Sequence, residues 1–307
     1  MQKQALRADL LMLLTAMIWG SGFVAQSSGM DHIGPYLFTG LRFALGSLCL
    51  LPLILRGPAS VESIKPEPFM TRSLLLGGMV MGLVLAAGIN LQQVGLLFTS
   101  VTNAGFITGL YVIVVPLLGL LMGHKTGTGT WMGAGMAVVG MFLLSVGDNF
   151  QVASGDWLQL IGAFVWGGHV ILVSLFASRH DAIRLAFLQF ITCSAVSLIL
   201  ALIFEEIHVA SIIAAAPAIL YGGVVAVGIG YTLQVIAQKN AIASHAAIIL
   251  SLEAVFAAIA GSLMLNESLH LKGYLGCALM LAGMLVAQLW PKKPEQSVVT
   301  VATTQGS

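Results

Sequence analysis

The chain has 307 residues, of which 13 are Lys or Arg and 12 are Asp or Glu, so that its formal net charge is only +1. Charged residues make up 8% of the chain and hydrophobic residues 58%, whereas a soluble domain carries about 25% charged residues. That is too little charge to cover a water-facing surface of this size. The composition therefore excludes soluble enzymes, nucleic-acid-binding proteins and disordered proteins, and it places most of the chain in a lipid bilayer.

Ten apolar stretches follow one another once breaks are placed at charged residues, prolines and turn residues. Each is close to the roughly 20 residues that a helix needs to cross a bilayer. Backbone groups in lipid must bond within their own segment, so we expect an all-α polytopic membrane protein with ten transmembrane helices. The expected spans are 10–29, 33–55, 72–96, 101–122, 130–147, 157–178, 183–204, 214–237, 243–265 and 271–290, followed by a disordered cytoplasmic tail over 291–307.

The basic residues indicate which ends of the spans face the cytoplasm, where Lys and Arg are in excess. With ten spans and both termini inside, 11 of the 13 basic residues lie on the inner side, Lys272 lies outside and Arg42 lies within a span. This count predicts an inner (plasma) membrane protein with cytoplasmic N- and C-termini. The outward-leaning acids are expected only at solvated loop ends; they are Asp31, Asp148, Asp156, Glu205, Glu206 and Glu267.

Several site classes are missing from the sequence. The three cysteines, Cys49, Cys193 and Cys277, all lie in apolar runs, which favours packing over a disulfide or a metal site. Neither G-x-x-x-x-G-K-[ST] nor H-E-x-x-H occurs, so we expect no ATP-hydrolysing loop and no metalloprotease site. We therefore expect no cofactor and no metal, and no activity as an enzyme.

The two halves of the chain resemble each other. The stretches Asp9–Gly20 and Asp156–Gly167, 147 positions apart, both have the pattern D-x-L-x-L-x-x-A-x-x-W-G. Leu91-Gln92 matches Leu233-Gln234 at 142 positions. Because each half holds five spans, an odd number, the second half is expected to insert upside down. Inverted repeats of this kind are typical of secondary transporters; the alternative is a gene duplication without a transport role.

An ordered series of short motifs extends this pattern. They are Ala16 to Gly20, Leu41-Arg42-Phe43, Val114 to Leu118, Trp166 to His169, Ser251 to Phe256, Asn266-Glu267 and Ala282 to Met284. In this order, over about residues 8–290, the chain resembles the drug/metabolite transporter superfamily in its EamA-type form, with two tandem five-helix domains. We place these repeats at 1–147 and 156–290. The resemblance implies a central cavity and a carrier of a metabolite, amino acid or drug-like solute, more often an exporter.

Two departures from the family pattern bear on structure. His124-Lys125 stands where the family commonly has Gly-Glu, and Ala254 stands where it usually has proline after Leu-Glu. The missing proline predicts a ninth helix that is straighter than in relatives. Pro116, deep in the fourth span, lacks a backbone donor and is expected to kink that helix.

Two charged side chains lie deep in the predicted bilayer. Arg42 is roughly 14 Å from the outer end of the second span, and Glu253 is roughly 15 Å from the inner end of the ninth. A charge at this depth costs at least about 2.5–3.5 kcal/mol, so it needs a reason to stay. We expect them to contribute to one polar cavity, either paired or each holding part of a zwitterion. A structural ion pair, or Arg42 bonded to backbone carbonyls, is the alternative.

Other polar side chains recur at helical spacing along the same spans. Each Asn or Gln alone is explained by an interhelical hydrogen bond of about 0.6 kcal/mol, but together they indicate a water-accessible cavity. Trp166 is expected either to pack or to stack on the solute, and His169 either to sit satisfied in the core or to carry a coupling proton. The candidate lining residues are Arg42, Asn90, Gln93, Asn103, Tyr111, Trp166, His169, Gln189, Tyr231, Gln234 and Glu253.

We therefore expect a secondary-active transporter that moves a small organic solute by alternating access. A membrane channel, or a polytopic membrane protein or enzyme without a transport role, is the alternative. The expected partners are a small-molecule substrate and membrane lipid, with no nucleic acid, and a coupling proton and a homodimer are left open.

Overall fold

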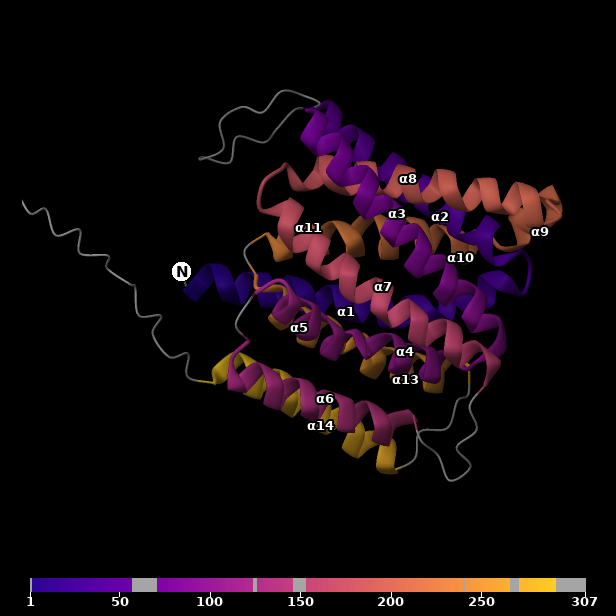
Figure 1. Ribbon diagram of the computed structural model, residues 1–307. Helices are drawn as coiled ribbons and strands as arrows, with labels where there is room; N and C mark the ends of the chain where they lie inside the picture. Colours follow the sequence, from indigo (N-terminus) through magenta and orange to yellow (C-terminus); the bar gives the residue numbers. More distant parts are fainter. Residues whose placement is uncertain are drawn as a thin grey trace, which may run out of the picture.

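The computed structural model describes residues 2–56, 71–123, 126–145, 153–239, 241–265 and 271–290, and every regular element in these ranges is helical (Figure 1). The expectations for the tail at 291–307, for His124-Lys125 and for Asn266-Glu267 lie outside these ranges.

The helices follow the apolar stretches of the sequence. The first half contains α1 (Gln2–Met30), α2 (Pro35–Leu55), α3 (Arg72–Gly95), a short 3-10 turn (Leu96–Phe98), α4 (Val101–Gly109), α5 (Tyr111–Leu121) and α6 (Thr128–Ser145). The second half contains α7 (Ser154–Ala177), α8 (Ala182–Phe204), α9 (Val209–Ala214), α10 (Ala216–Leu220), the π-helix η2 (Tyr221–Tyr231), α11 (Thr232–Gln238), α12 (Ala243–Leu250), α13 (Glu253–Met264) and α14 (Leu271–Leu289).

Within the described ranges, eight helical segments are long and apolar enough to cross a membrane. The apolar parts of α6 (Thr128–Leu143) and α14 (Leu271–Ala287) are shorter, and these two helices pack against each other at one side of the bundle (Figure 1). The chain is thus a multi-pass, all-helical membrane protein, in which the fifth and tenth expected spans are the short ones.

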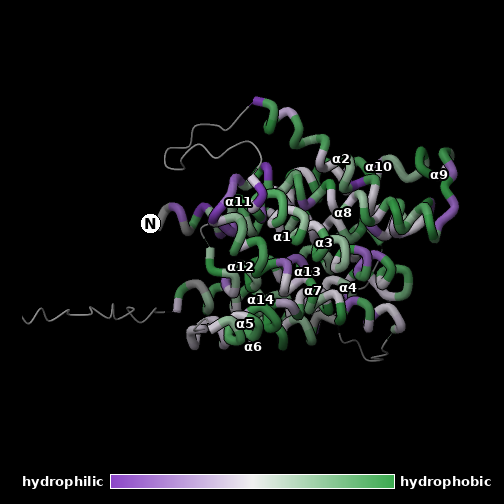
Figure 2. The backbone as a smooth tube through the Cα atoms, turned by 45° about the horizontal axis from the view of Figure 1, so that its top comes forward, coloured by the Kyte–Doolittle hydropathy of each residue, from purple (hydrophilic) through white to green (hydrophobic). Residues whose placement is uncertain are grey.

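The outer surface of the bundle is apolar and much of its interior is polar. Leu121 is 85% exposed and Phe204 is 68% exposed, whereas Arg42 is only 1% exposed. Figure 2 shows hydrophobic residues along nearly every helix, with hydrophilic segments gathered mainly at the ends. Such a surface suits lipid rather than water, because lipid imposes no cost on exposed leucine or phenylalanine.

The fourth and ninth spans are both interrupted, and at corresponding positions. Leu110 separates α4 from α5, and Ser251 and Leu252 separate α12 from α13. In the first half, the Leu110 amide donates to the Ile107 carbonyl at 3.1 Å and the Ile113 amide to the Leu110 carbonyl at 3.0 Å. These bonds reach three residues back instead of four, which tightens the helix into a single 3-10 turn.

The second half repeats this pattern 142 positions later. The Leu252 amide donates to the Ile249 carbonyl at 3.2 Å, and the Val255 amide donates to the Leu252 carbonyl at 3.0 Å. The ninth span is thus interrupted although Ala254 stands in place of proline, and the expectation that this helix is straighter than in relatives stays a prediction. In the fourth span the interruption lies at Leu110, six residues before Pro116, which itself sits inside α5.

Helix packing follows the same two-fold relation. The α3–α7 contact of one half has its counterpart in the contact between η2 and α1, and the α1–α13 contact has its counterpart in α7–α5. The pairs α2–α8 and α6–α14 map onto themselves. The internal repeat of the sequence is thus also a repeat of the packing, and its axis runs through the middle of the bundle.

Candidate functional site

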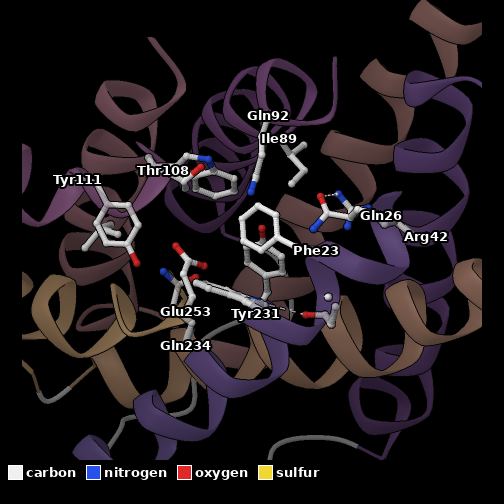
Figure 3. A pocket seen from close by; sticks show the side chains of 15 residues that line it. Phe23, Gln26, Arg42, Ile89, Gln92, Thr108, Tyr111, Tyr231, Gln234 and Glu253 are labelled. Atoms are coloured by element: carbon white, nitrogen blue, oxygen red, sulfur yellow. Dashed lines mark hydrogen bonds between the residues drawn. The ribbon is translucent and has the colours of Figure 1, made fainter. Parts of the chain in front are cut away.

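A small cavity of about 30 Å³ lies in the middle of the bundle. Its walls come from α1, α2, α3, α4, α5, α7, η2, α11 and α13 (Figure 3). The lining residues are Trp19, Gly22, Phe23, Gln26, Arg42, Ile89, Gln92, Thr108, Tyr111, Trp166, Val170, Ala226, Tyr231, Gln234 and Glu253.

Most of these lining residues are counterparts in the internal repeat. At 147 positions, Trp19 corresponds to Trp166 and Phe23 to Val170; at 142 positions, Ile89 corresponds to Tyr231, Gln92 to Gln234 and Tyr111 to Glu253. The cavity therefore lies on the pseudo-two-fold axis. Both halves contribute to it through equivalent positions with different side chains.

One end of the cavity is acidic. Glu253 is the first residue of α13 and Tyr111 is the first residue of α5, so each directly follows an interruption. Glu253 is 4% exposed and Tyr111 is 3% exposed. The Tyr111 hydroxyl points toward the Glu253 carboxylate without a hydrogen bond of ordinary geometry (Figure 3). The breaks thus bring a carboxylate and a phenol from opposite halves face to face.

Arg42 lies in another part of the cavity, and its guanidinium already has partners within the protein. Its Nη2 donates to Gln26 Oε1 at 3.2 Å and to Gln93 Oε1 at 3.1 Å. Its guanidinium also lies over the rings of Phe38 and Phe43, 5.2 and 5.5 Å from their centres. Among the described residues no ion pair joins Arg42 to Glu253. The two charged side chains that the sequence places deep in the bilayer are therefore not paired with each other in this structure.

Aromatic rings form a continuous wall beside the acidic end. The ring of Tyr231 lies 4.5 Å from that of Trp19 and 6.2 Å from that of Trp166, the latter pair nearly parallel at 22°. The Trp19 Nε1 donates to the Ala226 carbonyl at 3.3 Å, which fixes this indole against η2. The wall offers both ring faces and apolar area to a bound molecule.

Several buried polar atoms of the lining have no hydrogen-bond partner in the described part of the chain. They are Arg42 Nε, the Tyr111 hydroxyl, Trp166 Nε1 and Gln234 Oε1. Native proteins satisfy most buried polar groups, and each exception calls for an explanation such as a water, an ion or a ligand. Because these atoms gather around one cavity, we infer that a polar solute or water supplies their missing hydrogen bonds.

Six of the eleven residues expected from the sequence line the cavity: Arg42, Tyr111, Trp166, Tyr231, Gln234 and Glu253. Gln93 stands behind the cavity, where it accepts from Arg42 and its Nε2 donates to the Gln26 carbonyl at 3.4 Å. Asn90 bonds the Ala86 carbonyl and Ser197 Oγ, both at 2.8 Å. Asn103 begins α4 away from the lining.

His169 and Gln189 form a pair of their own, also outside the lining. His169 Nε2 and Gln189 Oε1 are 3.0 Å apart, and both residues are fully buried. The His169 ring meets the Trp166 ring edge-on, with centres 5.7 Å apart. His169 therefore contacts one of the cavity's lining residues, Trp166, without lining the cavity itself.

Two acids of the second half, which the sequence analysis expected at solvated loop ends, instead accept hydrogen bonds from residues of the first half. Asp156 is 8% exposed and accepts from the Thr99 hydroxyl at 2.6 Å. Glu205 accepts from the amides of Tyr36 and Leu37 at 2.7 and 2.8 Å, and so caps the start of α2. The expectation for these two was wrong, because their partners are brought to them only by tertiary packing.

The lining residues missed by sequence reasoning are mostly apolar, such as Phe23, or lie on α1. Gln92 is the exception that the repeat could have identified, since its counterpart Gln234 was among the candidates. Gln26 and Thr108 carry no spacing signal, because their repeat counterparts, Val173 and Leu250, are apolar.

Known proteins share both the sequence pattern and the fold. The sequence model of the EamA-like transporter family matches residues 6–146 and 153–288. An uncharacterized transporter of Archaeoglobus fulgidus is 30% identical over 288 residues, covering 92% of this chain and 86% of that protein. The inner membrane transporter YedA of Escherichia coli K12 is 30% identical over 158 residues, covering 49% of this chain and 47% of that protein.

Two further proteins bear on activity and fold. A probable amino-acid metabolite efflux pump of Salmonella typhimurium is 28% identical over 167 residues, covering 51% of this chain and 50% of that protein. A crystal structure with a TM-score of 0.72 and 19% identity covers 92% of this chain and 96% of its own, which shows a common fold. With two matching segments that together span nearly all of its helices, the chain belongs to the EamA-like transporter family, within the drug/metabolite transporter superfamily.

Proposed function

We propose that this protein is a secondary transporter that moves a small organic solute through the central cavity by alternating access. It does so in the inner membrane, as ten spans in two inverted five-helix units over 1–147 and 156–290, with both termini cytoplasmic. The observation that carries the proposal is the set of five repeat-related residue pairs around one cavity. Two halves that can exchange conformations would open such a site first to one side and then to the other.

The interrupted helices support this mechanism. Transporters commonly place solute sites where spanning helices are discontinuous, because irregular backbone is tolerated at bilayer depth only beside a cavity. Here the interruptions at Leu110 and Leu252 lie beside Tyr111 and Glu253, two lining residues. The half-helices α5 and α13 are therefore suited to move as the cavity opens.

The unsatisfied polar atoms of the lining support a small organic solute rather than an inorganic ion. The lining holds unpartnered donors and acceptors together with aromatic rings, and ligand sites in proteins are mostly apolar with a few placed polar groups. The amino-acid metabolite efflux pump among the relatives favours export of an amino acid or a related metabolite as the direction and substrate class.

The test begins by finding the solute. Untargeted metabolomics of cells and medium, comparing a deletion strain with an overexpressing strain, should show one or a few solutes that accumulate outside when the protein is abundant. Each such solute is then assayed for counterflow with purified full-length protein in proteoliposomes. A carrier saturates and shows counterflow; flux without counterflow would indicate a channel, and a product of changed mass would indicate an enzyme.

Variants of the two buried charges complete the test. Glu253→Gln and Arg42→Gln should each reduce flux by tenfold or more, about 1.4 kcal/mol or above. Wild-type flux in both variants, with normal folding, would contradict the assignment of this cavity as the transport site.

A further inference from the structure

We propose that the acidic end of the cavity binds a protonated amine, so that the preferred solutes are organic ammonium compounds that carry an aromatic or similar apolar ring. The inference rests on the proposed transport function and names the chemical class of its substrate. It follows from a difference between the two buried ionisable side chains of the cavity: Arg42 has several partners within the protein, and Glu253 has no cation beside it.

The positive charge of the cavity already has partners within the protein. Arg42 donates to Gln26 and Gln93 and lies over two phenylalanine rings. A solute anion at this position would compete with these contacts. The Arg42 Nε has no partner among the described residues, and it can donate one hydrogen bond to a solute oxygen.

The negative charge of the cavity has no such compensation. Glu253 forms no ion pair with any described residue, although it is only 4% exposed. A buried carboxylate without a cation is costly, and the cost is removed when an opposite charge binds beside it. The cavity thus holds a carboxyl group with no cation beside it and a guanidinium that already has neutral partners within the protein, which favours a positively charged solute.

The atoms around Glu253 match the hydrogen-bonding capacity of an ammonium group. An ammonium has three N–H donors and no acceptor. The carboxylate of Glu253, the hydroxyl oxygen of Tyr111 and the amide oxygen of Gln234 can each accept one. The Tyr111 hydroxyl points toward the carboxylate (Figure 3), and the Gln234 oxygen has no hydrogen-bond partner among the described residues. These three acceptors come from α13, α5 and α11, so the ammonium would join both halves of the chain.

The aromatic wall favours the same ligand. Faces of Trp and Tyr rings attract cations, and Trp19, Trp166 and Tyr231 line the cavity beside Glu253. Their faces also accommodate the apolar ring of a solute, with Trp166 Nε1 free to donate to a substituent. The repeat counterparts of Glu253 and Tyr231 are Tyr111 and Ile89, which carry no charge. The cavity therefore has one ammonium position and not two.

Four probes that share a phenylethyl skeleton test the charge preference directly: 2-phenylethylamine, phenylalanine, 3-phenylpropanoate and 2-phenylethanol. Their binding to the purified full-length protein is measured by calorimetry and by tryptophan fluorescence. The amine should bind most tightly, the zwitterion more weakly, and the anion and the alcohol weakest. Equal or tighter binding of the anion or the alcohol, or no binding of the amine up to the millimolar range, would overturn the proposal.

Variants locate the amine at Glu253. Glu253→Gln should weaken amine binding by about thirtyfold or more while leaving the alcohol unaffected, and Glu253→Asp should restore part of the loss. Glu206→Gln is the matched control, because the Glu206 side chain is 92% exposed outside the cavity. If Glu253→Gln does not fold, Gln234→Leu, which removes one acceptor, should still weaken the amine selectively. Unchanged amine affinity in a folded Glu253→Gln or Gln234→Leu protein would overturn the assignment.

The two proposals fail in different ways. Counterflow of a solute without any preference for ammonium compounds would overturn the substrate class and leave transport intact. Selective amine binding without counterflow of any solute would overturn transport and leave the binding site intact.

Discussion

Tyr111 and Glu253 are counterparts in the two halves of the chain, and each is the first residue after a helix interruption, so that their side chains face each other across the central cavity (Figure 3). The backbone that places them is the same in both halves, with 3-10 bonds at Leu110 and Leu252. The side chains differ, one a phenol and the other a carboxylic acid. The repeat thus gives both halves the same backbone geometry at this end of the cavity but different side chains.

Removing the carboxylate of Asp156 should weaken the contact between the halves at the start of α7. Asp156 accepts from the Thr99 hydroxyl at 2.6 Å and from the Ala153 amide at 2.8 Å. Asp156→Ala breaks both bonds and should cost about 1–3 kcal/mol of folding stability. Thermal unfolding of the detergent-solubilised protein measures the loss. Thr99→Val breaks only the contact between halves and should give a smaller effect; equal stability of all three proteins would contradict this role.

Glu205 should behave as a cap for α2, although it belongs to α8. Its two oxygens accept from the Tyr36 and Leu37 amides, which are otherwise unsatisfied at the helix start. Glu205→Ala should lower stability by about 0.5–2 kcal/mol. The neighbouring Glu206, largely exposed, provides the control, and Glu206→Ala should leave the melting temperature unchanged. A loss of equal size in both variants would show that capping is not the cause.

Close packing of α1 on α13 should not tolerate a side chain at Gly20. A Cβ there would lie 2.7 Å from the Ala257 amide nitrogen and from the Glu253 carbonyl oxygen, which are backbone atoms that cannot turn away. Gly20→Ala should therefore cost about 1–3 kcal/mol and disturb Glu253. At Gly168 a Cβ would meet nothing within 4 Å, so Gly168→Ala should have no such effect in the same unfolding assay.

Gln93 should influence transport through Arg42, although it does not line the cavity. Gln93→Leu removes one acceptor of the guanidinium and the bond to the Gln26 carbonyl. We expect solute flux to fall in the same direction as in Arg42→Gln, by about tenfold, because Arg42 would lose its orientation. Gln93→Glu keeps an acceptor and should retain more flux than Gln93→Leu. If the two substitutions reduce flux equally, Gln93 does not act by positioning Arg42.

The helical architecture was predictable from the sequence because hydropathy and length suffice to locate membrane helices. The starts of α2 and α3 lie within two residues of the expected spans. Depth in the predicted bilayer also identified the two charged cavity residues, Arg42 and Glu253. Tertiary contacts, by contrast, leave no local signal in the sequence. The residues around Asp156 and Glu205 in the chain do not indicate that these acids bind Thr99 and the start of α2.

The interruption of the ninth span escaped prediction for a related reason. Proline was taken as the cause of a break, yet at Leu252 the chain shifts its hydrogen bonds without one. A single 3-10 turn costs little when neighbouring helices support it. The sequence counterpart Leu110 shows the same turn, so the interruption is a property of the repeated fold and not of one residue.

The most direct test of the central claim asks whether the cavity opens to both sides of the membrane. Gly22 lines the cavity, and a Cβ there would be 3.6 Å from Ala226, so Gly22→Cys fits. In a protein whose Cys49, Cys193 and Cys277 are replaced by Ala, this thiol is treated with a membrane-impermeant maleimide in right-side-out and in inside-out vesicles. Alternating access predicts labelling from either side, and protection by a transported solute. Labelling from one side only, or labelling that the solute does not affect, would contradict it.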